Sequence, residues 1–300
     1  MGRVFRRPHA PRILAVVAAI VLLTLGLIVG LRSDTERSGT GSPGCGGTRV
    51  LDTSTGQPMR CTFDDEFDGT SLDPARWSVV RTEAAGFHAG PECYVDDGQH
   101  VSVGGGVLTL TATRTAHPYN CGGRMTNYLS GMVSSSGHFA QQYGVVAVHA
   151  ELPATAGLQP ALWMYPQTET YGPWPNSGEI DIAELFGNNP GAVSAHLHFK
   201  PRNGTQNGVG QNCSVADPSG TFHTYTVTWT PQQLVFGYDG RLCARFAGWR
   251  AAGMNPPAPF DHPFYLLLEM ALGSTAGNLP SATTPLPARL RVDWIRAWGT

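Results

Sequence analysis

The 300-residue chain is predicted to fold as an all-β sandwich of two sheets. Glycine and proline supply 37 and 23 residues, a fifth of the chain, which is typical of many short strands joined by turns. After residue 32 no long stretch shows the capped periodicity of a helix. Five segments alternate in polarity or run apolar as strands do, namely 107–113, 143–152, 224–229, 234–238 and 289–298. With 41% hydrophobic residues, one large β domain is the simplest organisation.

The first 32 residues read as a targeting segment. Four arginines precede an uncharged run of 19 residues from Ile13 to Leu31. This run is longer than the roughly 7–15 residues of a secretory signal core and fits the roughly 17–25 residues of a membrane span. We therefore expect an uncleaved membrane anchor, with a cleaved signal segment as the alternative, and the remaining chain on the extracellular side. Residues 33–47 are predicted to be a flexible linker and residues 48–300 the catalytic domain.

Six cysteines lie beyond the targeting segment, in what should be an oxidising compartment. Their even number favours disulfides over free buried thiols, and their long spacings without paired histidines disfavour a metal site. Fifteen pairings exist for six cysteines. Proximity in the sequence suggests Cys45–Cys61, Cys93–Cys121 and Cys213–Cys243.

Three carboxylates stand between apolar residues in the predicted strand 178–184. Side chains alternate along a strand, so Glu179 and Asp181 share one face, and Glu184 joins them only if a residue bulges out near Ala183. Two carboxylates facing one sugar are what cleavage of a glycosidic bond requires. Asp181, between the two glutamates, would help to keep their pKa values apart. The alternatives are an acidic face of an exposed strand and a cation site built from the same oxygens.

The stretch from Trp174 to Glu184 resembles the signature of glycoside hydrolase family 16, in the laminarinase-like branch with this bulged spacing. Further matches follow in chain order and cover most of the chain from about residue 60: 63–69, 71–73, 76–77, 105–112, 130–135, 143–144, 160–164, 222–225, 229–231, 239–240, 263–266 and 292–296. The resemblance implies a concanavalin-like jelly roll with a concave substrate cleft and a retaining double displacement. Glu179 would be the nucleophile, Glu184 the general acid/base and Asp181 the residue that tunes the nucleophile, with the two glutamate carboxyl groups about 5–5.5 Å apart.

Sugar rings need aromatic platforms flanked by polar groups, and Trp163 and Trp174 are the predicted platforms. His198 matches the family's histidine on the strand after the acids, with a structural role as the alternative. Gln159 and Glu269 depart from the laminarinase pattern where sugar contacts are expected. They are therefore candidate substrate contacts, and they leave the preference for β-1,3-glucan open.

The resemblance also suggests a structural calcium ion, held by Asp293, Glu66 and a backbone carbonyl near Gly106, while catalysis would need no cofactor. The net charge of −2, with basic residues dispersed, argues against nucleic acid and polyanionic partners, so the expected partner is a neutral polysaccharide. We expect a monomer that hydrolyses internal β-linkages of a β-1,3-(1,4-)glucan. An endo-β-galactanase, a transglycosylase of the same family and a non-catalytic glycan-binding module are the alternatives.

Overall fold

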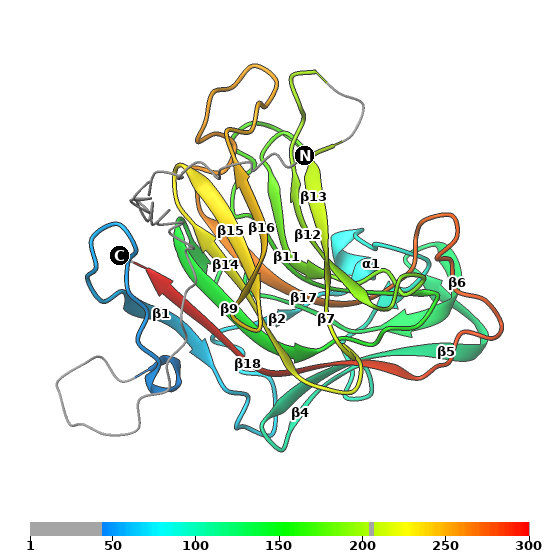
Figure 1. Ribbon diagram of the computed structural model, residues 1–300. Coiled ribbons are helices and arrows are strands. Elements are labelled where there is room, and N and C mark those ends of the chain that lie inside the picture. Colours follow the sequence, from blue (N-terminus) through cyan, green and yellow to red (C-terminus); the bar gives the residue numbers. More distant parts are fainter. Residues whose placement is uncertain (1–43, 204–206, 300) are drawn as a thin grey trace, which may run out of the picture.

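The structure, a computed structural model, describes residues 44–203 and 207–299. These residues form two β-sheets stacked as facing layers (Figure 1). The predicted membrane anchor and nearly all of the predicted linker lie outside the described residues. Within the two described ranges, no helix is long and apolar enough to cross a membrane. The all-β prediction is confirmed, because the part of the chain that the structure describes has only the short helix α1 (Thr82–Ala85) and a 3-10 turn (Cys45–Gly47) besides its strands.

The larger sheet has ten strands and packs behind the sheet that carries the predicted acids. Its order is β16 (Arg241–Ala247), β15 (Gln233–Tyr238), β14 (His223–Trp229), β9 (Gly144–Glu151), β18 (Ala288–Gly299), β5 (Val107–Cys121), β6 (Arg124–Ser130) and β3 (Cys93–Tyr94). Two more strands pair outside this path, β1 (Arg60–Asp65) with β18 and β4 (Val101–Gly104) with β5.

The second sheet has eight strands and carries the predicted acids. Its order is β13 (Val209–Ser214), β12 (Ala192–His198), β11 (Glu179–Glu184), β10 (Leu158–Pro166), β17 (Phe264–Leu272), β7 (Met132–Ser134) and β2 (Ser78–Val79), and β8 (Ala140–Gln141) pairs with β17. The strand of the acids, β11, is paired on both sides, with β10 and β12. An exposed edge strand therefore does not account for its acids.

The core lies between the two sheets and explains the apolar positions around the acids. Ile180 and Ile182 of β11 are at most 1% exposed and belong to one cluster with residues of the opposite sheet such as Val148 and Ile295. Burial of these side chains fixes which face of β11 turns inward, because a slip by one residue would place them in solvent. The other face of β11 is thereby left for polar groups.

Three disulfides join the pairs that sequence proximity suggests: Cys45–Cys61, Cys93–Cys121 and Cys213–Cys243, with Cα separations of 5.8, 5.8 and 5.6 Å. The third connects β13 with β16, the edge strands of the two sheets, which lie alongside each other in Figure 1. Disulfides of this kind persist in oxidising compartments and fit an extracellular domain.

Candidate active site

A β-bulge in β11 brings the three acids to one face of the sheet. On β12, Asp181 pairs with His196 and Glu184 with Ser194, so two residues of β11 face the single residue between them. The extra residue lies at Ile182–Ala183, which is where the spacing between Asp181 and Glu184 predicts a bulge. A bulge leaves backbone groups without ladder partners. Here the hydroxyl of Tyr238, from the opposite sheet, donates to the carbonyl of Ile182 at 2.9 Å and satisfies it.

Glu179 is held at the start of β11 by two neighbours. The indole N–H of Trp174 donates to its Oε2 at 2.8 Å, and His198 Nε2 lies 3.7 Å from its Oε1. Trp174 is 46% exposed, so its ring is open to a ligand while its nitrogen holds the acid. Burial, and next the charge of Asp181, raise the pKa of Glu179 above its ordinary value, whereas His198 and the indole donor act in the opposite direction.

Asp181 and His198 form the closest charge pair of the site. His198 Nε2 lies 3.1 Å from Asp181 Oδ2, and Asp181 is only 4% exposed. Burial alone would lower the pKa of His198, but the hydrogen bond and charge of Asp181, together with Glu179, raise it to about 9. The imidazolium form therefore dominates at neutral pH and offsets the crowded carboxylates. His196 stacks on this ring, with centroids 4.2 Å apart and planes at 4°.

Glu184, at the far end of β11, has the environment of a proton donor. Burial and the charge of Asp181 raise its pKa to about 7, against the opposing effects of Gln159 and His198. The amide of Gln159 donates to Glu184 Oε1 at 2.7 Å. Gln159 thus lies directly beside the acids, where the sequence places a departure from the laminarinase pattern.

Trp163 and Glu269 also lie on this face but are covered. Trp163 is 8% exposed and Glu269 is 3% exposed, so neither is an open platform or an open contact. The hydroxyl of Tyr94 bridges Glu269 and Glu92. The sequence interpretation missed Tyr94, Glu92 and Phe87, an exposed aromatic residue beside Trp163. Their only signal in the sequence was a set of aromatic and acidic side chains in the stretch from Thr82 to Cys93, an insert relative to the family pattern, and directly after it.

The arrangement of the acids could also suit a cation. Among the described residues, the one group of side chains that could hold a metal ion is Glu179, Asp181 and His198, whose ligand atoms lie within 4.8 Å of one another. A metal would need His198 to be deprotonated, and its raised pKa opposes this at neutral pH. A protonated His198 therefore favours proton transfer chemistry over metal binding at these residues.

The residues expected to bind calcium do not fit a calcium site as placed. Both carboxylate oxygens of Glu66 accept hydrogen bonds from Arg296, at 2.6 and 2.7 Å. Asp293 Oδ2 lies 2.8 Å from His149 Nδ1. Calcium needs about six to eight oxygen ligands, and these oxygens already have nitrogen partners. Gly106 lies near a different carboxylate, that of Asp68.

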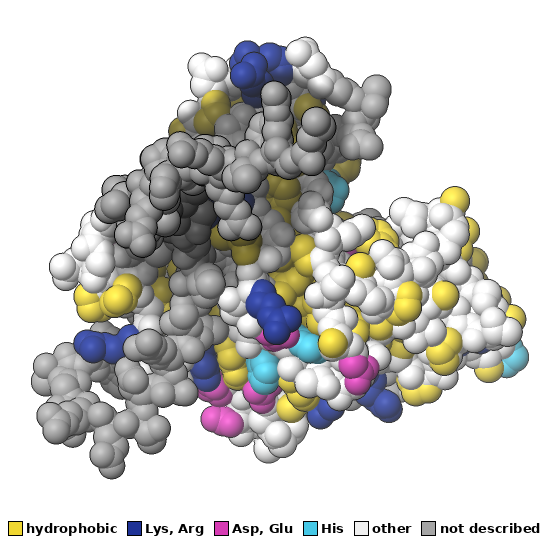
Figure 2. Space-filling model, viewed as in Figure 1, with side chains coloured by type: hydrophobic (Ala, Val, Ile, Leu, Met, Phe, Trp, Pro, Cys, Tyr) yellow, Lys and Arg dark blue, Asp and Glu magenta, His cyan; other side chains and the backbone are white. Residues whose placement is uncertain are grey.

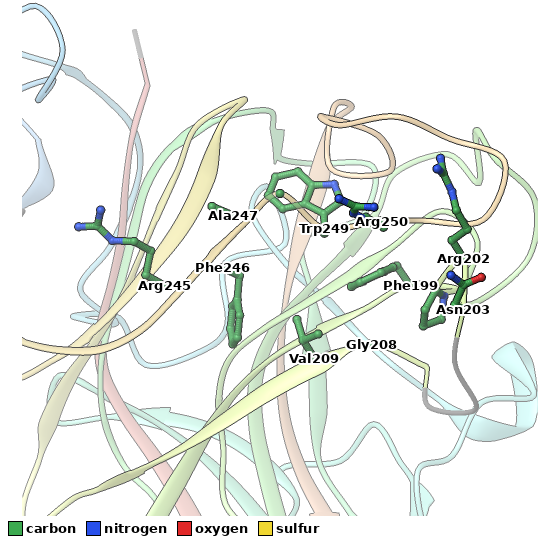
Figure 3. A pocket seen from close by; sticks show the side chains of 12 residues that line it. Phe199, Arg202, Asn203, Gly208, Val209, Arg245, Phe246, Ala247, Trp249 and Arg250 are labelled. Atoms are coloured by element: carbon green, nitrogen blue, oxygen red, sulfur yellow. The ribbon is translucent and has the colours of Figure 1, made fainter.

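A separate hollow of about 670 Å³ opens between β13 and β16. Figure 3 shows Phe199, Phe246 and Val209 along it and Arg202 and Arg250 at its rim. Val209 pairs with Leu197, whose side chain is in the core, so this hollow is on the opposite face of the sheet from the acids. It is therefore distinct from the site built on β11.

Comparison with known proteins agrees with this geometry. Residues 92–296 match the model of the glycosyl hydrolases family 16. The chain belongs to this family. Over 260 residues it is 32% identical to the glucan endo-1,3-beta-glucosidase A1 of Niallia circulans, covering 80% of this chain and 38% of that protein. Over 249 residues it is 34% identical to the beta-glucanase of Rhodothermus marinus, covering 79% and 84%.

A solved structure, the laminarinase from Rhodothermus marinus, superposes with a TM-score of 0.69 at 32% identity, covering 80% of this chain and 97% of that one. The family 16 fold, the two-sheet sandwich and the assignment as a glycoside hydrolase are thereby confirmed. The carboxylate chemistry of such an enzyme needs no cofactor. The chain spans little more than a third of the Niallia circulans protein.

Proposed function

We propose that this family 16 protein is a retaining endo-glycosidase that hydrolyses internal linkages of a β-1,3-(1,4-)glucan. The observation that carries the proposal is the bulge in β11, because it sets Glu179, Asp181 and Glu184 side by side. Without it, Glu184 would point into the core and the proton donor would be absent.

In the first step Glu179 attacks the anomeric carbon and the bond to the leaving oxygen breaks. Glu184 gives that oxygen its proton, so the leaving sugar departs as a neutral alcohol. In the second step Glu184, now a carboxylate, removes a proton from water, which attacks the anomeric carbon and releases Glu179. The pKa of about 7 suits Glu184 to both roles near neutral pH.

Asp181 and His198 act through the nucleophile. Glu179 must be ionised to attack, although burial favours its neutral form. The indole N–H of Trp174 and the positive charge of His198 stabilise the carboxylate of Glu179, and Asp181 holds His198 in place at 3.1 Å. A sugar ring stacked on the exposed face of Trp174 would lie beside this nucleophile.

A neutral glucan is the substrate that fits best. Only 14% of residues are charged, and in the face shown in Figure 2 apolar and uncharged side chains cover most of the described surface, with charged ones mainly along its lower part. The relatives from Niallia circulans and Rhodothermus marinus are named as glucanases. We propose that the chain acts as a monomer on the extracellular side, held there by its N-terminal segment as a membrane anchor.

The test is the substitution Glu179→Gln, assayed on laminarin and mixed-linkage glucan, with agarose as the β-galactan alternative. Turnover should be lost while glucan binding, measured by isothermal titration calorimetry, remains. Glu83→Gln, an exposed carboxylate of α1, is the matched control and should be fully active. Undiminished hydrolysis by Glu179→Gln would refute the assignment.

The stereochemistry gives a second, independent test. Fresh product followed by NMR should carry the β-anomer at first, because double displacement retains configuration. Products longer than the starting oligosaccharide would show that transfer to a sugar hydroxyl competes with hydrolysis, and exclusive cleavage of agarose would favour the galactanase.

A further inference from the structure

An exposed aromatic ring lies on the acid-bearing face of the second sheet, on the β17 side of the acids. Phe87, just after α1, is 38% exposed. Its ring centroid lies 6.1 Å from that of Trp163 and 6.2 Å from that of Tyr94, and its plane is nearly parallel to Tyr94, at 12°. Trp163 and Tyr94 therefore both pack against the Phe87 ring. The described apolar side chains with comparable exposure include one other aromatic, Trp174, beside the nucleophile.

The loop that carries Phe87 is fastened to β17 by a buried carboxylate. Glu92 is fully buried, and its Oε1 accepts hydrogen bonds from the backbone N–H groups of Ala89 and Gly90, at 3.1 and 2.8 Å. Its Oε2 accepts from the N–H of Leu272, in β17, at 3.0 Å. At Gly90 a Cβ would lie 2.3 Å from the carbonyl of Leu272, so only glycine permits this approach. The loop is thus held rigidly against the sheet.

Glu269 completes this fastening. The hydroxyl of Tyr94 lies between Glu92 Oε1, at 2.8 Å, and Glu269 Oε1. One hydroxyl proton cannot serve two carboxylates, so both contacts are hydrogen bonds only if one acid is protonated. Three backbone donors already satisfy Glu92 as a carboxylate. The proton therefore belongs to Glu269, which donates to Tyr94 while Tyr94 donates to Glu92. Burial raises the pKa of Glu269 to about 8, in agreement with this arrangement.

The strand pairing shows on which side of the acids Phe87 lies. Ala161 of β10 pairs with Glu184 on one side and with Glu269 on the other, so two strand spacings separate these acids. Two spacings amount to about 9–10 Å. Phe87 packs on Trp163 of β10, which pairs with Asp181, and on Tyr94, whose hydroxyl reaches Glu269 of β17. Its ring therefore lies on the β10–β17 side of the acids.

We propose that Phe87 is a glycan-binding platform for a sugar unit away from the scissile bond, and that Glu269 is a positioning residue that holds its loop through Tyr94 and Glu92. This inference rests on the proposed function. The apolar face of a sugar ring stacks on the exposed part of the Phe87 ring. Glu269 itself remains covered and does not touch the glycan.

The experiment compares Phe87→Ala, Glu269→Leu and Glu269→Gln on laminarin and on laminari-oligosaccharides of increasing length. Phe87→Ala should raise KM about three- to tenfold, with kcat little changed, on chains long enough to reach it. Glu269→Leu should raise KM similarly because the loop loosens. Glu269→Gln, which keeps a neutral side chain able to hydrogen-bond with Tyr94, should restore the wild-type KM. Leu242→Ala, an exposed side chain of β16, is the control and should change nothing.

Binding to the same oligosaccharides is measured in the Glu179→Gln background, which separates recognition from turnover. An unchanged dissociation constant on adding Phe87→Ala, while the wild-type enzyme hydrolyses laminarin, would overturn this inference alone. A wild-type protein that neither binds nor hydrolyses laminarin would overturn the proposed function and this inference with it. Equal KM values for Glu269→Leu and Glu269→Gln would refute the positioning role of Glu269.

Discussion

Gln159 donates a hydrogen bond of 2.7 Å to Glu184, the residue proposed as the proton donor. The amide donor favours the charged form of the carboxyl group and so opposes the burial that raises the pKa of Glu184. A second contact fixes the orientation of this amide, because Gln159 Oε1 accepts from the backbone N–H of Ser274 at 3.2 Å. Gln159 is therefore placed to set the pH at which Glu184 gives up its proton.

Replacing Gln159 by Leu should move the alkaline limb of the pH profile upward. Loss of the donor raises the pKa of Glu184 above about 7, and a hydrogen bond to a charged group of 1.5–3 kcal/mol corresponds to a shift of roughly one pH unit or more. The measurement is kcat/KM on laminarin from pH 4 to 10. Gln232→Leu, in the exposed turn between β14 and β15, should leave the limb in place. A limb that moved to lower pH would contradict this role.

Tyr238 should be needed for the geometry of the acids although it lies in the opposite sheet. Its hydroxyl satisfies the carbonyl of Ile182 at the bulge, and Tyr238→Phe would leave that carbonyl without its donor. We expect a loss of about 1–3 kcal/mol in the free energy of unfolding, together with a lower kcat. Denaturant titration and kinetics on laminarin measure the two effects.

Tyr225→Phe is the matched control for Tyr238. Tyr225 is paired with Tyr238 in the same sheet and is also buried, but its hydroxyl has no hydrogen-bond partner among the described residues. Its removal should cost little stability and no activity. If both substitutions lowered kcat equally, the bulge would not depend on the bond from Tyr238.

The local features of the site could be predicted from the sequence because they depend on neighbours along one strand. The buried positions of Ile180 and Ile182 fix the face of β11, and the spacing from Asp181 to Glu184 then requires a bulge. The family resemblance could also be predicted, because its motifs occur along the chain in the family's order. These inferences needed no knowledge of how distant segments meet.

The remaining contacts could not be predicted, because they join residues far apart in the sequence. Trp163 was expected to be an open platform, but its exposure depends on Phe87, which is 76 residues earlier and reaches it only through the fastened loop. Glu269 was expected to contact the substrate, and its partner Tyr94 comes from 175 residues away. The pattern of residues within a strand carries no information about such partners.

The folded protein should lose stability as the pH rises from about 5 to 9. The pKa values of Glu184, Glu269 and His198 are raised to about 7, 8 and 9, so the folded state binds protons that the unfolded chain has already released. The contribution of each group to the free energy of unfolding is complete when the pH is below its pKa in the unfolded chain. It is lost as the pH rises through its pKa in the folded protein. Each group contributes up to about 1.4 kcal/mol per pH unit inside its own window.

Thermal unfolding measured across this range checks the prediction, with Glu269→Gln as the informative variant. This substitution removes one of the three titrating groups, so its melting temperature should fall less steeply between pH 5 and 8. A wild-type melting temperature that rose over this pH interval would contradict the raised pKa values of these groups.

Two disulfides of similar loop size should differ in their effect on substrate affinity. Cys93–Cys121 and Cys213–Cys243 span 28 and 30 residues, so replacing either pair by serine should destabilise the protein by a similar amount, about 3–4 kcal/mol in the chain-entropy model. Cys93 lies next to Glu92, Tyr94 and the loop of Phe87, whereas Cys213–Cys243 joins the edge strands β13 and β16. Only Cys93→Ser/Cys121→Ser should raise KM for long laminari-oligosaccharides, measured well below both melting temperatures. An equal rise in both variants would show that the rigidity of the whole sandwich, and not the fastened loop, governs affinity.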